Sequence, residues 1–193
     1  MKTKNALLSA AVLAVTISMV SCDKEKTDAP VQPITKTKDI TVNFSGTTPF
    51  TLFSFKDTSV VANTDSTSTK WDFALRLTTF LVNSYSGGPG NAGVIVQDGL
   101  YDNITTAPAA GYAYDTTASQ RAIKDGSWYD YNPTTHSFVP KAGKVFIFRT
   151  GDGSHYAKME LLSADYAPFT GPAPNQIIYK MRFTYQPDGS KNF

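Results

Sequence analysis

The chain has 193 residues, of which 41% are hydrophobic, with 18 Lys and Arg against 16 Asp and Glu. This near-neutral balance, without a basic stripe, argues against nucleic acid as a partner, because phosphate binding depends on clustered Lys and Arg. The single cysteine leaves no partner for an internal disulfide and excludes a metal site built from several thiolates.

Residues 1–21 have the pattern of a lipoprotein signal peptide. Lys2 and Lys4 precede a mostly apolar run from Ala6 to Val20, which is short for a membrane-spanning helix of about 20 residues. The run ends in MVSC, where a small residue precedes Cys22, as in lipoproteins whose cysteine is acylated. Lipidation explains an unpaired cysteine in an exported chain. The alternative is an ordinary secreted protein with a stray cysteine.

Residues 22–38 are expected to form the lipidated cysteine and a polar tether. The residues after Cys22, DKEK, are similar to the lysine-plus-acid tags that some Gram-negative lipoproteins carry for display on the outer face of the cell. The rest of the segment contains prolines and has no apolar period, which is typical of a linker. We therefore expect a surface-exposed protein of the outer membrane that touches the bilayer through its lipid alone. The alternative is a tether without a display signal.

Residues 39–193 are expected to form one all-β domain. The length of this segment is typical of a single domain. Residues 40–44, ITVNF, alternate between apolar and polar side chains, which predicts a half-buried strand. Residues 71–77, WDFALRL, alternate in the same way. The side chains expected to point inward from this second strand are Trp71, Phe73, Leu75 and Leu77.

The C-terminal part of the domain has the clearest strand patterns. Residues 145–149, VFIFR, predict a buried strand, and residues 156–163 continue after the glycine-rich turn 151–154, so the two segments are expected to form a hairpin. Residues 177–185, IIYKMRFTY, alternate with period two. The side chains on their apolar face are Ile177, Tyr179, Met181, Phe183 and Tyr185.

Long loops and few or no helices complete the expected fold. Residues 86–93 and 167–175 are rich in Gly, Pro and Asn, which is typical of loops. Residues 116–124, TTASQRAIK, are the candidate for a short helix. Long stretches with a helical period are absent, so the class is mainly β with an antiparallel sheet. The patterning leaves open whether the strands form a sandwich or a curved open sheet.

The sequence contains no motif of a common enzyme class, and we expect a protein that is not an enzyme. G-x-S-x-G, H-E-x-x-H, the P-loop and the dinucleotide-binding glycine pattern are all missing. A glycosidase needs two carboxyl groups that face each other across a cleft, and sequence spacing alone does not bring such a pair together. The carboxylates taken as exposed and available for such a pair are Asp98, Asp102, Asp115, Asp125 and Asp130.

The two histidines differ in their surroundings. His155 follows the turn 151–154 and has the context of an exposed turn residue. His136 lies between WYDY, 128–131, and FVP, 138–140, so aromatic side chains surround an imidazole that could coordinate iron. The same Pro-Thr-Thr-His stretch is also typical of a solvated hairpin turn. From the residues alone, both interpretations of His136 remain open.

A series of short motifs extends along most of residues 39–186. In chain order they are WDFALR (71–76), GGPGNAG (87–93), VIV (94–96), VFIFR (145–149), GDG (151–153), YAKM (156–159) and FTY (183–185). Together with the lipoprotein start, this order resembles the HmuY family of surface lipoproteins, which bind haem and pass it to an outer-membrane receptor. The motifs lie on strands and turns, so the resemblance supports the fold more than the ligand.

The resemblance implies an all-β fold that holds haem as its cofactor between two extended loops, and a TonB-dependent receptor as partner. In family members two axial ligands, histidines or methionines, hold the iron. The first ligand would come from residues 115–127, which contain neither residue type, and the second from the loop that contains His136. His136 is therefore the candidate axial ligand, with water or a tyrosine opposite it. For Met159 and Met181 we expect core packing.

The short first loop also favours an alternative function. The chain could have the HmuY fold, lack haem ligation, and bind another small ligand or a protein partner. Aromatic residues near the loops would then supply the contacts, although packing at strand ends is the alternative role for them. These residues are Tyr112, Tyr114, Trp128, Tyr129 and Tyr131.

Overall fold

The computed structural model describes residues 30–44 and 47–193. The predicted signal peptide and Cys22 lie outside the described residues. The larger of two sheets has five antiparallel strands. Their order across the sheet is β1 (Ile34–Asn43), β11 (Gln176–Gln186), β10 (Tyr156–Tyr166), β9 (Lys144–Arg149) and β6 (Gly93–Asp98).

The second sheet has four shorter strands, and a separate hairpin completes the β-structure. The order in the second sheet is β3 (Ser59–Val61), β2 (Thr51–Ser54), β4 (Phe73–Arg76) and β5 (Thr79–Val82). The hairpin consists of β7 (Tyr129–Asn132) and β8 (Ser137–Pro140). The helical segments in the described part are the single 3₁₀ turns η1 (Asn63–Asp65) and η2 (Tyr101–Asn103). None of the described helices is long and apolar enough to cross a bilayer.

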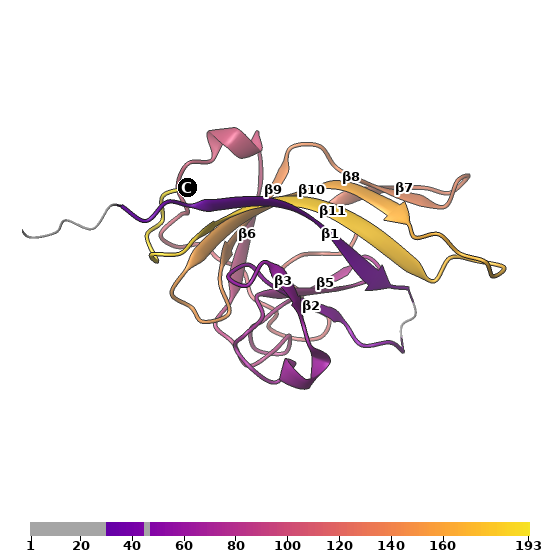
Figure 1. The fold of residues 1–193 in the computed structure, drawn as a ribbon, viewed down its shortest axis with the longest axis horizontal. Coiled ribbons are helices and arrows are strands. Elements are labelled where there is room, and N and C mark those ends of the chain that lie inside the picture. Colours follow the sequence, from indigo (N-terminus) through magenta and orange to yellow (C-terminus); the bar gives the residue numbers. More distant parts are fainter. Residues whose placement is uncertain (1–29, 45–46) are drawn as a thin grey trace, which may run out of the picture. The chain divides into compact units, whose positions relative to one another are not determined.

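The two sheets face each other as a sandwich, and the main core lies between them (Figure 1). Its centre is a group of phenylalanine rings contributed by both sheets, with Phe53 and Phe73 from the smaller sheet and Phe148 and Phe183 from the larger one. Phe55 follows β2 directly and lies among these four rings, with centroid distances of 5.2 to 5.8 Å. Burial of this aromatic surface is the main source of stability in such a core.

The strand predictions for the C-terminal half are confirmed. All five predicted inward side chains of residues 177–185 are buried, and β9 and β10 form the predicted hairpin around the turn 151–154. β9 is buried on both faces. Phe146 and Phe148 belong to the main core, whereas Val145 and Ile147 pack under η2.

Trp71 does not lie on the predicted face. Phe73 and Leu75 point into the main core, but Trp71 packs with Leu52 and Ala74 on the opposite face of the smaller sheet. The chain bends at Asp72 before β4 begins, so the period-two alternation does not extend back to Trp71. The predicted inward position of Trp71 in this strand is therefore wrong.

Two further expectations differ from the structure. Residues 116–124 form no helix but a loop closed by an isolated bridge between Thr117 and Gln120, because Asp115 fixes the backbone on both sides of the turn. β1 begins at Ile34 and pairs with β11 from its first residue. The ordered domain therefore starts within the segment predicted to be a tether, residues 22–38.

The tryptophan-aspartate and glycine motifs meet at one junction between the sheets. The carboxylate of Asp72 is buried and accepts hydrogen bonds from the backbone N–H groups of Phe55, at 2.7 Å, and Gly151, at 2.7 Å. The side chain of Asn83 donates to the backbone carbonyl of Trp71 and accepts from the N–H of Gly90. These motifs are therefore structural, since they join the start of β4 to the β9–β10 turn.

Lys158, from the YAKM motif, has a comparable structural role. Its side chain is buried, and its ammonium group donates to the backbone carbonyls of Tyr101 and Ile104 at 3.0 and 2.7 Å. The ammonium also lies 4.4 Å from the centroid of the Tyr101 ring, which favours the charged form. Burial lowers the pKa of Lys158. The contacts hold η2 against the outer face of the larger sheet.

The Asp72 junction predicts a pH-dependent stability. Burial raises the pKa of Asp72 to about 7 from an ordinary 3.8, so the folded protein binds this proton more tightly than the unfolded chain. The contribution of this proton to the free energy of unfolding is complete below about pH 4. As the pH rises from there to about 7, the free energy of unfolding falls by about 1.4 kcal/mol per pH unit. Urea unfolding between pH 4.5 and 8 measures this slope. Asp72→Asn is expected to flatten it, whereas exposed Asp165→Asn is expected to leave it unchanged. An equal slope in wild type and Asp72→Asn would contradict the assignment.

Candidate functional site

The hairpin β7–β8 forms one wall of an open groove of about 600 Å³. The opposite walls come from the residue after β1, the end of β10 and the proline-rich loop 167–175 between β10 and β11. We call this the aromatic groove, because five aromatic rings line it together with His136. The rings are those of Phe44, Tyr131, Phe138, Tyr166 and Phe169.

His136 is exposed at the tip of the hairpin, where Asn132 pairs with Ser137. Its backbone φ is +53°, in the left-handed region that few residues other than glycine adopt. The side-chain oxygen of Asn132 accepts hydrogen bonds from the N–H groups of Thr134 and Thr135, which is a common way to close a turn. The predicted hairpin turn is therefore present, and it holds His136 at the groove.

Two tyrosines fix the orientation of His136. The Tyr131 hydroxyl lies 2.7 Å from Nδ1 of the imidazole, and the Tyr166 hydroxyl donates to the backbone carbonyl of His136. Nε2 has no hydrogen-bond partner among the described residues. When Nδ1–H donates to Tyr131, the lone pair of Nε2 is available for a ligand, and such a hydrogen bond is the usual support of a metal-binding histidine.

The rings within each wall of the groove pack against each other. Phe44 contacts Tyr166 with ring centroids 5.7 Å apart, and Tyr131 contacts Phe138 at 5.2 Å. Phe169 is 48% exposed, so an apolar ring from the loop 167–175 is available for a ligand. Burial raises the pKa of Tyr166, so its phenol stays protonated and remains a hydrogen-bond donor.

The predicted contact residues lie in different places. Tyr131 alone among them lines the aromatic groove. Trp128 is buried in the main core, and Tyr129 is half-buried beside it with its hydroxyl hydrogen-bonded to Asp125. Tyr112 and Tyr114 lie near the guanidinium of Arg149 at the edge formed by β6 and β9.

The other candidate iron ligands are remote from His136. His155 precedes β10, whereas Tyr166, which contacts His136, ends it. At about 3.3 Å per residue the two ends of this strand are about 30 Å apart. Nδ1 of His155 lies 2.7 Å from a carboxylate oxygen of Asp152. Met159 and Met181 are fully buried in the main core, as expected from their place in the strands.

The five candidate carboxylates each have another partner in the structure. Asp98, Asp102 and Asp130 form ion pairs with lysine or arginine side chains, and Asp125 accepts from the Tyr129 hydroxyl. Asp115 was expected to be exposed but is fully buried. Within the described residues, no group of three or more His, Cys, Asp or Glu side chains could hold a metal ion.

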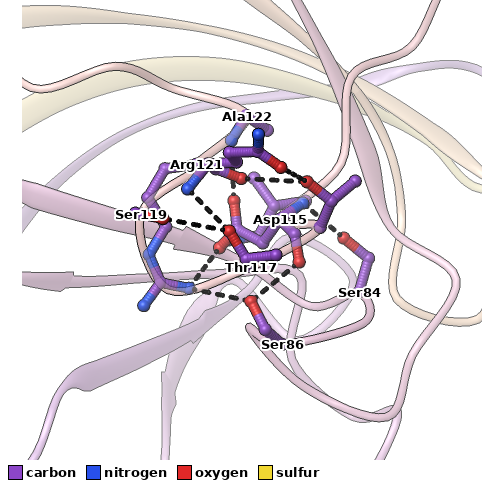
Figure 2. A network of polar contacts seen from close by, with 10 residues as sticks. Ser84, Ser86, Asp115, Thr117, Ser119, Arg121 and Ala122 are labelled. Carbon is purple, nitrogen blue, oxygen red and sulfur yellow. Dashed lines mark hydrogen bonds and ion pairs between the residues drawn. The ribbon is translucent and has the colours of Figure 1, made fainter.

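Asp115 instead organises the loop 115–127, which precedes β7 (Figure 2). Its carboxylate accepts from the N–H groups of Val82, at 3.0 Å, and Ala122, at 2.8 Å, and pairs with Arg121 at 3.3 Å. Its backbone carbonyl accepts from Ser86. Burial raises the pKa of Asp115, and these donors oppose the rise. The loop is therefore tied back to the smaller sheet and contributes no residue to the aromatic groove.

Sequence reasoning missed most of the groove. Phe44, Tyr166 and Phe169 come from separate segments, and no local pattern predicts that they meet. Phe169 carried the best available signal, since an apolar ring stands within the proline- and glycine-rich stretch APFTGPAPN. An exposed aromatic residue in such a loop is a candidate for ligand contact.

Comparison with solved structures gives a fold relationship. The crystal structure of an apo HmuY analogue from Tannerella forsythia matches with a TM-score of 0.53 at 15% sequence identity, covering 82% of this chain and 100% of that chain. No protein-family model matches the chain, and no curated protein matches it. The chain therefore has an HmuY-like, mainly antiparallel β fold, as the motif order predicted.

Proposed function

We propose that this protein is a lipid-anchored binding protein on the surface of a Gram-negative bacterium, which captures haem in the aromatic groove and delivers it to a TonB-dependent outer-membrane receptor. The observation that carries the proposal is the position of His136. Its imidazole lines a groove with aromatic walls, Nδ1 is held by Tyr131, and Nε2 is free to act as an axial ligand. The HmuY-like fold is consistent with this role.

The residues of the groove fit a flat, apolar ligand with one iron-binding side chain. A volume of about 600 Å³ lies within the range of about 300 to 1,000 Å³ for small-molecule sites. Haem would supply an iron centre with two axial positions. His136 would hold one position, and Tyr131 orients the imidazole. The rings of Phe44, Phe138 and Phe169 would cover the macrocycle, and a tyrosine or water would take the second position.

A haemin titration followed by absorbance tests the proposal. Wild type is expected to give a saturable Soret shift, and Tyr131→Phe is expected to weaken binding about tenfold, as for other hydrogen bonds that support a ligating histidine. His136→Ala is expected to weaken binding further, because the ligand itself is lost. The matched control is His155→Ala, which is expected to bind haemin like wild type. A wild type without a saturable shift, or a His136→Ala variant with an unchanged one, would overturn the assignment.

A second function is favoured by the loop 115–127. This loop is tied to the smaller sheet through Asp115 and contains neither histidine nor methionine. The groove could then bind another flat or apolar ligand, or a side chain of a partner protein, without iron ligation. Protoporphyrin IX without iron separates the two functions. Binding that requires iron and His136 supports haem capture, whereas equal binding with and without iron supports the second function.

A further inference from the structure

A second groove, of about 680 Å³, lies between the β4–β5 turn and residues 118–125. We call it the basic groove, because three cationic side chains from two segments of the chain line it. Arg76 ends β4, and Arg121 and Lys124 belong to the loop tied back by Asp115. The one carboxylate in the lining is that of Asp125. With the Asp115 carboxylate that pairs with Arg121 also counted, three cations stand against two carboxylates, which leaves a local formal charge of +1.

Arg76 is held in place by contacts that leave the charge of its guanidinium group unpaired. Its guanidinium lies over the Phe50 ring, 4.1 Å from the centroid, and Nη1 donates to the backbone carbonyl of Thr48 at 3.2 Å. No carboxylate lies within ion-pair distance of Arg76 in the described part of the chain. The stacked guanidinium keeps further N–H donors for a ligand, and its planar fork suits an oxyanion.

The other two cations differ in how they are held. Arg121 is fixed by the network of Figure 2, where Nη1 contacts the buried carboxylate of Asp115 at 3.3 Å and the Ser86 hydroxyl at 3.5 Å. The ammonium group of Lys124 is exposed and forms no ion pair or hydrogen bond with a described residue. A fixed guanidinium beside an ammonium group without a partner among the described residues leaves that ammonium group available to a ligand.

The cationic side chains that line this groove repel each other. An anion bound between them would relieve that repulsion. Hydroxyl and amide groups of Thr79, Ser119 and Gln120 also line the basic groove, so polar groups beyond the charged ones are available. The hollow is larger than one inorganic oxyanion, and Asp125 disfavours a ligand with charge on every side. We propose that the basic groove binds a phosphate or sulfate monoester of a small polar molecule such as a sugar.

This site is separate from the aromatic groove, since no residue lines both, and it does not depend on haem. Isothermal titration of the full chain at low ionic strength with glucose 6-phosphate, glucose 6-sulfate and glucose tests it. We expect saturable binding of at least one of the two esters, and none of glucose. The ester that binds more tightly identifies whether the groove prefers a phosphate or a sulfate group.

Variants separate the basic groove from general surface charge. Arg76→Gln combined with Lys124→Gln is expected to weaken ester binding at least about tenfold, in line with the loss of two charge-assisted contacts. Lys180→Gln removes one exposed charge from β11 and is expected to change binding less than about twofold. The inference is overturned when neither ester binds the folded wild type, when glucose binds as tightly as the esters, or when the double variant binds like wild type.

Discussion

Phe55→Ala is expected to lower the free energy of unfolding by about 3 to 5 kcal/mol. Phe55 is fully buried, and its ring contacts those of Phe53, Phe73, Phe148 and Phe183. Alanine removes the contacts with both sheets at once and leaves a cavity that rigid rings cannot fill. Because typical domains are stable by only about 5 to 15 kcal/mol, this loss is a large share of the total. Urea unfolding followed by far-UV circular dichroism measures it.

The matched control is Phe169→Ala, which removes the same side chain from the exposed loop 167–175. Phe169 is 48% exposed, so its removal is expected to change the free energy of unfolding by less than about 0.5 kcal/mol. The same variant is expected to weaken haemin binding, because the ring lines the aromatic groove. A loss below about 1 kcal/mol for Phe55→Ala would contradict the placement of this ring at the centre of the core.

Gly151→Ala is expected to lower the free energy of unfolding by about 3 kcal/mol. A Cβ atom at this position would lie 2.2 Å from the backbone carbonyl oxygen of Trp71 and 2.8 Å from that of Thr69. Both obstacles are backbone atoms, which yield less than a flexible side chain. Their displacement also separates the Gly151 N–H from the Asp72 carboxylate, which it reaches at 2.7 Å. Thermal and urea unfolding of the variant measure the combined cost.

Gly171→Ala makes the same chemical change where space is available. The nearest atom to a Cβ at Gly171 is 3.9 Å away, so this variant is expected to be as stable as wild type or slightly more stable, since alanine restricts the unfolded chain. Equal stabilities for the two alanine variants would show that the approach of Gly151 to the Trp71 carbonyl does not limit the fold.

The parts of the fold that could be predicted from the sequence depend on local pattern. In β11, Tyr179, Met181 and Phe183 alternate with polar residues, because one face of this strand covers the core and the other is partly open. The β9–β10 hairpin followed from the apolar run 145–149 and its glycine-rich turn. In both cases the residues that determine the structure are neighbours in the chain, so period and turn chemistry are sufficient.

The remaining features depend on contacts between distant residues. Trp71 leaves the face shared by Phe73 and Leu75, because Asp72 bonds to the Gly151 backbone N–H and the chain bends there. Residues 116–124 have a composition that allows a helix, but the buried carboxylate of Asp115 binds the N–H groups of Val82 and Ala122 and closes a loop instead. No local pattern contains this information.

For the candidate site, too, the sequence predicted the residues that are neighbours in the chain and missed those from distant segments. His136 and Tyr131 were found because they share one short hairpin, whereas Phe44, Tyr166 and Phe169 reach the groove from separate segments. For Trp128 the sequence allows ligand contact or packing at a strand end, and the residue is buried in the main core. The aromatic content of the hairpin therefore indicated a binding region. Which aromatic rings line that region depends on how distant segments pack in the β-sandwich.

The central claim is that His136, and not His155, binds haem iron. The chain has two histidines, so a histidine-selective ¹⁵N NMR spectrum contains the imidazole signals of these two residues. On addition of ferric haemin, the His136 signals are predicted to shift strongly or broaden beyond detection, because the paramagnetic iron would be bonded to Nε2. The signals of His155, about 30 Å away along β10, are predicted to stay in place. Unchanged His136 signals at saturating haemin would contradict the account.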